Sequence, residues 1–243
     1  MKFFGRASFG FSGGIAFLLL TGGAGADVVA QPNSSVVPAG DVVLEKELHR
    51  CSPEPCVLDT ISGEPASWAF HDLLLTLGVP GGIAELPNSE EKFGYTFNVQ
   101  GRKVVDFLNS FTIAEPRYQW TQTDGVLNLL PVQESVLLRT PISEFAAQDA
   151  NVWELIEALK QNPDFQVSCK KLNFVERSPE NFFFGRFRKP VPPALRFSFR
   201  FRHLTVRQIL NEIVKRDGIW HYHEFSWPDG TLGFNLYISE YAS

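Results

Sequence analysis

The feature that most constrains the fold is a change of hydrophobic period in the last third of the chain. Between residues 197 and 201, Phe alternates with polar residues, which predicts a half-buried strand. From Val206 to Val214 the apolar residues are spaced as on one face of a helix. Alternation then returns on both sides of Asp229-Gly230, which is a hairpin turn signal. This segment is therefore expected to fold as strand, helix and hairpin.

The same order of patterns occurs earlier in the chain. Apolar and polar residues alternate over 95–99, and helical spacing follows over 104–111. A strand at 118–120 then leads through Asp124-Gly125 into another strand at 127–129. A separate helix is expected over 67–77, ended by Gly at position 78.

The two units align at an offset of 102 positions, which places Asn109 on Asn211 and Leu108 on Leu210. The shared hydrophobic phase and the shared Asp-Gly turns favour an internal duplication. The alternative is that any two units of this βαββ type would align in this way.

The repeated unit resembles the short N-terminal (STN-type) modules of secretins and TonB-dependent receptors. The resembling stretches are FNVQGRKVVDFLNSF with YQWTQTDGVLNLLP, and FRFRHLTVRQILNEIVKRDGIWHY. The second unit carries the Thr-Val start of the family's helix at Thr205 and Val206, whereas Gly101-Arg102-Lys103 precedes the helix in the first unit. The resemblance implies docking to other proteins, and it implies no catalysis.

The first 26 residues have the three-part layout of a secretory signal. Lys2 and Arg6 give a positive start, an uncharged apolar centre follows, and Ala24-Gly25-Ala26 fits the small-residue rule for cleavage. We therefore expect a periplasmic or secreted protein. The other interpretation is a retained membrane anchor, although the many Gly residues in this segment are unfavourable in a helix.

Export would permit disulfide bonds among the three Cys residues. Cys51 and Cys56 are separated by a short, Pro-containing segment, so we expect a local disulfide between them. Cys169 is left over, either as a buried or half-buried free thiol or as the site of an intermolecular bond.

The remaining chain is divided by composition. We expect a linker or arm over 27–62, a first module over 63–134, a middle segment over 135–193 and a second module over 194–243. The middle segment should contain a helix over 151–160, a strand over 165–169 and a loop over 176–193. The predicted fold class is α+β, with two small βαββ modules and antiparallel or mixed sheets.

Two histidines are the residues most suited to metal chemistry. His221 and His223 flank Tyr222 on a predicted strand, so both imidazoles lie on one face of it. Such a pair can share a metal ion. A third ligand would have to come from His203, Asp229 or Glu240. The alternative is that both side chains face solvent on an outer sheet face.

A basic segment lies between residues 166 and 216, within a chain whose net charge is −5. The candidate residues for an anion-binding face are Arg186, Arg188, Lys189, Arg200, Arg202 and Arg207. Basic and aromatic residues together can bind nucleic acid. However, alternation puts the Phe side chains on one strand face and the Arg side chains on the other, and export separates the protein from nucleic acid. We therefore expect no nucleic-acid partner.

Motifs of catalysis are missing from the sequence. There is no G-x-S-x-G elbow, no H-E-x-x-H and no Gly-rich phosphate loop, and the sequence implies no cofactor. The leading hypothesis is a non-enzymatic envelope protein that binds other envelope proteins or itself through strand edges, with at most peripheral contact to a membrane. The alternatives are an enzyme that uses His221 and His223 and a module that binds anionic carbohydrate or lipid.

Overall fold

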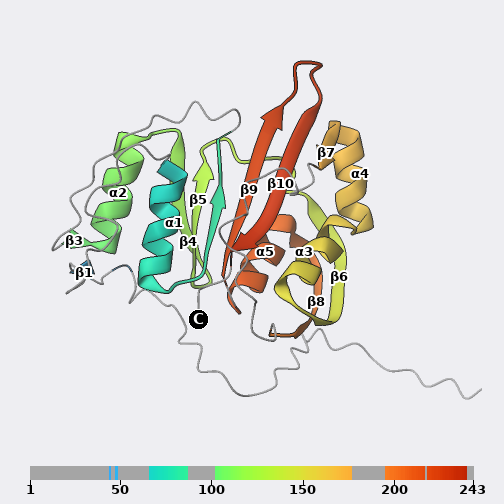
Figure 1. Ribbon diagram of the computed structural model, residues 1–243, viewed down its shortest axis with the longest axis horizontal. Coiled ribbons are helices and arrows are strands. Elements are labelled where there is room, and N and C mark those ends of the chain that lie inside the picture. Colours follow the sequence, from blue (N-terminus) through green and yellow to red (C-terminus); the bar gives the residue numbers. More distant parts are fainter. Residues whose placement is uncertain are drawn as a thin grey trace, which may run out of the picture.

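The computed structural model describes residues 44, 47–48, 66–86, 102–176, 195–216 and 218–239. The predicted signal segment, the predicted strand at 95–99 and most of the predicted arm lie outside these residues. Helices and strands are mixed along the described chain, and the sheets contain both parallel and antiparallel pairs. The α+β class predicted from the sequence is therefore confirmed (Figure 1).

The centre of the molecule is a six-stranded sheet in the order β4-β5-β2-β9-β10-β7. Its strands are β2 (Gly81–Ala84), β4 (Tyr118–Thr123), β5 (Val126–Pro131), β7 (Phe174–Glu176), β9 (Ile219–Ser226) and β10 (Leu232–Ser239). Strands β4 and β5 form one antiparallel hairpin, and β9 and β10 form another. Strand β2 lies between the hairpins and is parallel to both β5 and β9. The two predicted modules thus contribute strands to the same sheet.

Two two-stranded ribbons are separate from this sheet. Strand β1 (Glu47–Leu48) pairs with β3 (Arg102–Lys103), and β6 (Pro141–Ala150) pairs with β8 (Phe197–Thr205). Both pairings are antiparallel. Strands β3 and β8 each run directly into a helix, so each ribbon is tied to the start of that helix.

The helices pack on opposite faces of the sheet. They are α1 (Ala66–Leu77), α2 (Val104–Ala114), α3 (Val152–Lys160), α4 (Pro163–Leu172) and α5 (Val206–Val214). Helices α1 and α2 belong to one buried cluster with Ile83 and Ile219, whereas α3, α4 and α5 belong to another with Ala84 and Trp220. Because successive residues of a strand point to opposite faces, these two clusters lie on the two sides of the sheet.

One order of elements occurs twice in the described chain. The first half reads β1-α1-β2-β3-α2-β4-β5, and the second reads β6-α4-β7-β8-α5-β9-β10 with α3 added before α4. The ribbons also share a register: Leu48 faces Arg102 in the first half, and Ile142 faces Leu204 in the second. The pair lies just before α2 in the first half and just before α5 in the second. Whether the halves arose by duplication stays a prediction.

Two glycines of β2 lie at the junction between the halves. Gly81 and Gly82 begin β2, all of whose residues are buried. A Cβ atom on Gly82 would lie 2.0 Å from the Trp220 ring, and one on Gly81 would lie 2.2 Å from the Leu74 side chain. Glycine therefore allows side chains from both faces to pack directly on the β2 backbone.

Most predicted elements are confirmed, and one is wrong. Helices occur close to 67–77, 104–111, 151–160 and 206–214, and both predicted hairpins form. The predicted strand at 165–169 is instead part of α4. Asn162 caps this helix and Pro163 occupies its first turn, so the Asn-Pro pair begins a helix where we expected only a break. Phe165 and Cys169 then share its buried face.

None of the helices in the described ranges has the length and apolar character needed to cross a membrane.

Candidate functional site

The ribbon formed by β6 and β8 carries most of the described residues that the sequence analysis singled out for binding. Among the described residues, β8 pairs with β6 alone, so its other edge has no neighbouring strand. The nine residues of β8 alternate between half-buried and exposed side chains over most of its length. The strand therefore presents a backbone edge with different chemistry on its two faces.

One face of β8 carries a phenylalanine row, formed by Phe197, Phe199 and Phe201. All three side chains are partly buried and pack at the margin of the larger core. Consecutive rings contact one another, with centroids 6.2 Å apart for Phe197 and Phe199 and 5.2 Å apart for Phe199 and Phe201. Phe145 of β6 stacks on Phe201. The row is thus held in a fixed arrangement while part of its apolar surface remains uncovered.

The opposite face of β8 carries an arginine row, formed by Arg200 and Arg202. Their side chains are 64% and 62% exposed. Glu144 of β6 lies between them, with its Oε1 atom 2.8 Å from Arg200 Nη2 and 3.9 Å from Arg202 Nη2. Exposed pairs of this kind contribute little stability, so the guanidinium groups can exchange Glu144 for another carboxylate at little cost.

Arg207 does not belong to this row. It lies in the first turn of α5, and its Nε atom is 3.1 Å from Glu134 Oε1. Arg186, Arg188 and Lys189 lie outside the described residues. The structure therefore places two of the six candidate basic residues side by side on β8 and gives Arg207 a different partner.

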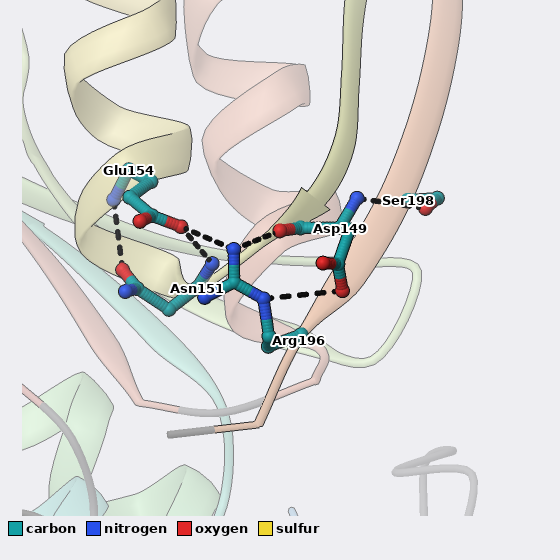
Figure 2. A network of polar contacts seen from close by, with 5 residues as sticks. All are labelled: Asp149, Asn151, Glu154, Arg196 and Ser198. Atoms are coloured by element: carbon teal, nitrogen blue, oxygen red, sulfur yellow. Dashed lines mark hydrogen bonds and ion pairs between the residues drawn. The ribbon is translucent and has the colours of Figure 1, made fainter. Parts of the chain in front are cut away.

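The start of β8 is fixed by a polar network around Arg196 (Figure 2). Its Nε atom is 3.1 Å from Asp149 Oδ1, and its Nη2 atom is 3.2 Å from Glu154 Oε2 and also donates to the Asp149 carbonyl. The Asp149 backbone N–H donates to Ser198 Oγ at 3.1 Å. Asn151 and Glu154 form a reciprocal capping box at the start of α3. These contacts hold β8 to the end of β6 and to α3.

The backbone is irregular at both strands of the ribbon. The register between β6 and β8 shifts between Ala147 and Ala150, and Asp149 has a φ of 48°. His203 in β8 has a φ of 55°, which is uncommon for a residue other than Gly. His203, one of the three candidates for a third metal ligand, is exposed on this ribbon. Bulges of this kind bend an edge strand and redirect its side chains.

The two histidines of the predicted metal pair have different surroundings. His221 is buried, and its Nε2 atom lies 3.1 Å from Ser239 Oγ. The His223 Nδ1 atom is 2.8 Å from Glu85 Oε2, and its side chain is partly exposed. Trp220 and Tyr222 face the opposite core, as alternation predicted. Within the described ranges, no three His, Cys, Asp or Glu side chains are grouped as metal ligands, so metal binding by His221 and His223 stays a hypothesis.

Burial dominates the acid–base properties near these histidines. It lowers the pKa of His221 to about 3, with a further contribution from nearby His71. Burial also raises the pKa of Tyr237, and the charge of Glu85 adds to this effect. On the other face, burial and Glu224 raise the pKa of Tyr222 well above its usual value. His221 is therefore a neutral imidazole at physiological pH.

His71 is the residue near this position that the sequence analysis missed. It lies on α1, and its ring centroid is 5.1 Å from that of His221. The signal in the sequence for a site at His71 was its place on the predicted helix, between Phe70 and Leu74, which are both buried. The spacing alone did not show that this helix packs across β9.

Cys169 is a free, buried thiol on α4. Burial raises its pKa to about 11, and the charge of Glu176 adds to this effect. A thiol with a raised pKa is a poor nucleophile, which fits the first of the two interpretations, a buried structural cysteine. Cys51 and Cys56, the predicted disulfide pair, lie outside the described residues.

Comparisons of the whole chain with protein-family models, curated proteins and solved structures find no match.

Proposed function

We propose that this protein is an exported, non-enzymatic interaction module that binds a segment of another envelope protein along the outer edge of β8. The single observation that carries the proposal is the outer edge of β8, which pairs with no other strand among the described residues, beside a partly uncovered phenylalanine row. Strand addition supplies main-chain hydrogen bonds along such an edge, and the side chains on each face select the sequence that binds.

The two faces of β8 define the chemistry of the partner. A strand added to this edge would place alternate side chains beside the phenylalanine row and beside the arginine row. The first set should be apolar, because it would cover the exposed parts of the three rings. The second set should be acidic, because Arg200 and Arg202 are largely exposed. The partner is therefore an extended segment in which apolar and acidic residues alternate.

The rigidity of the edge supports this mode of binding. The Arg196 network and the stacked Phe145 and Phe201 rings hold β8 before any partner binds. A preorganised edge loses less conformational entropy on association than a mobile one. The contacts of this network are with Asp149 and Glu154, on the β6 side of β8, so the network itself does not occupy the other edge of that strand.

The proposal can be tested by site-specific photo-crosslinking of the full chain in cells that produce it. A photoreactive residue at position 202 should give a discrete adduct with a partner, whereas the same residue at exposed position 119 on β4 serves as the matched control. A synthetic segment of the partner, identified by mass spectrometry, should then bind the purified protein. Arg200→Glu should weaken this binding at least about tenfold because it reverses a charge on the arginine row.

Two results would contradict the proposal. The first is an equal adduct yield at positions 202 and 119. The second is unchanged affinity for the segment after Arg200→Glu. An adduct between two copies of this chain would assign the edge to self-association, which sedimentation of the purified protein at several concentrations would verify.

A further inference from the structure

Two imidazole nitrogens converge on one hydroxyl oxygen beside α1, near the start of β9 and at the end of β10. The His71 Nε2 atom lies 3.3 Å from Ser239 Oγ, and the His221 Nε2 atom lies 3.1 Å from the same oxygen. His71 comes from α1, His221 from β9 and Ser239 from β10. A helix of the first half and the last hairpin of the second half thus direct nitrogen and oxygen atoms at one point.

The spacing of these atoms matches the corners of a tetrahedral metal site. With metal–nitrogen bonds of about 2.0 Å, neighbouring ligand atoms around a tetrahedral ion are separated by about 3.3 Å. Two imidazoles bound to such an ion through Nε2 have ring centroids about 5 Å apart by the same geometry. The observed separations are 3.1 and 3.3 Å for the two nitrogen–oxygen pairs and 5.1 Å for the ring centroids of His71 and His221. Little rearrangement is needed to admit an ion.

The surrounding groups hold both rings in place for this role. Asp72 Oδ1 lies 3.5 Å from His71 Nδ1, so a carboxylate charge stands next to the site and favours a bound cation. The Tyr237 ring stacks on His221 with an interplanar angle of 7°. Ser239 Oγ donates to the Ile219 carbonyl at 3.3 Å, so its lone pairs face the two imidazoles.

We propose that His71 and His221 form a binding site for a divalent transition-metal ion of the zinc class. Ser239 Oγ occupies a third position, and water completes the coordination. Imidazole nitrogen selects zinc, copper and nickel over magnesium and calcium, which prefer oxygen ligands. This site replaces the partner that the sequence suggested, because His223 contacts Glu85 instead. An ion at this position would join α1 of the first half to β9 and β10 of the second.

The test is calorimetric titration of the chelator-treated full chain with Zn²⁺, with Mg²⁺ as the control ion. Wild-type protein should bind one Zn²⁺ and show a higher melting temperature in its presence, and Mg²⁺ should have no effect. His71→Ala and His221→Ala should each weaken Zn²⁺ binding at least about tenfold, and Asp72→Asn about tenfold. His223→Ala is the matched control and should bind as wild type. Co²⁺ should give the visible absorption of a tetrahedral site in the wild type and in His223→Ala, but not in His71→Ala or His221→Ala.

The proposal is overturned if wild-type protein shows no saturable Zn²⁺ binding, or if His71→Ala binds as tightly as wild type. Removal of the buried His221 could prevent folding, which far-ultraviolet circular dichroism would show. In that case His71→Ala and Asp72→Asn decide the question, because both positions are partly exposed on α1. Loss of Zn²⁺ binding in His223→Ala together with normal binding in His71→Ala would instead support a site formed by His221 and His223, the pair predicted from the sequence.

Discussion

The two halves of the molecule share an order of elements but differ in the strand that each half adds beside its hairpin, β2 in the first half and β7 in the second. Strand β2 of the first half lies between β5 and β9, and every residue in it is buried. Strand β7 of the second half holds the corresponding position beside β10, but among the described residues it has no second neighbour. Its last two residues are exposed, and Glu176 pairs with Lys160 of α3.

This difference shows how position in a sheet restricts sequence. An interior strand must accept side chains packed on both faces, and β2 does so with two glycines. An edge strand can carry a charge, which discourages further pairing. The ribbons differ in a similar way, since β1 and β3 pair over two residues each whereas β6 and β8 are nine or more residues long. The two halves therefore keep the same order of elements although their corresponding strands differ in burial, charge and length.

The largest effect is expected from Gly82→Val in β2. The new side chain would overlap the Trp220 ring and lower the free energy of unfolding by about 3 kcal/mol or more. The matched change Val175→Thr in β7 should alter the free energy of unfolding by less than about 0.5 kcal/mol, because the side chain is exposed. Urea unfolding of both variants measures the difference. Similar losses in the two variants would contradict the contrast between β2 and β7.

A smaller effect is expected from one contact that both halves contain. Trp220 Nε1 donates to Asn211 Oδ1 at 2.8 Å in a buried position, and Trp120 Nε1 donates to Asn109 Oδ1 at 3.2 Å in an exposed one. Asn211→Ala would leave a buried indole donor unpaired, at a cost of about 1–3 kcal/mol. Asn109→Ala should cost less than about 0.5 kcal/mol, because water replaces the amide. Equal losses of unfolding free energy in the two variants would show that burial of the Trp–Asn contact does not determine its contribution to stability.

The smallest effects concern the starts of α2 and α5. Thr205 and Gln208 form a capping box at α5, whereas the Lys103 side chain makes no capping hydrogen bond at α2. Thr205→Ala should therefore destabilise the protein by about 1 kcal/mol, and Lys103→Thr should stabilise it by about 0.5 kcal/mol. Thermal unfolding should show shifts of opposite sign. A loss of stability in Lys103→Thr would mean that other contacts of Lys103 outweigh the cap.

The periodic parts of the fold could be predicted because local sequence determines them. The helix from Val206 and the hairpin at Asp124-Gly125 carry strong signals of spacing and turn chemistry, and both residues of that turn have positive φ. Strand β6 was not predicted because its buried residues Ile142 and Phe145 are three positions apart, which is not the alternation of a strand, and a register shift follows at Ala147. Strand β2 was not predicted because Gly81 and Gly82 give no strand signal, and their role depends on Trp220 far along the chain.

The candidate sites were predicted in part for the same reason. Alternation correctly separated the phenylalanine and arginine faces of β8 and placed His221 opposite Trp220. It could not show that Glu144 lies between Arg200 and Arg202, because that contact depends on the pairing of β6 with β8. His71 was missed because its meeting with His221 depends on how α1 crosses the sheet. Contacts between distant segments therefore account for the site features that were missed.

The parallel pairing of β2 with β9 also sets an order for biosynthesis. Gly81 and its neighbours are made well before their partners, Ile219 to Tyr222, which lie more than a hundred positions later in the sequence. One edge of β2 therefore stays without this partner until β9 has been synthesised. Unpaired strand edges favour aggregation during this interval. We therefore expect folding of the nascent chain to depend on chaperones that cover this edge until the C-terminal hairpin arrives.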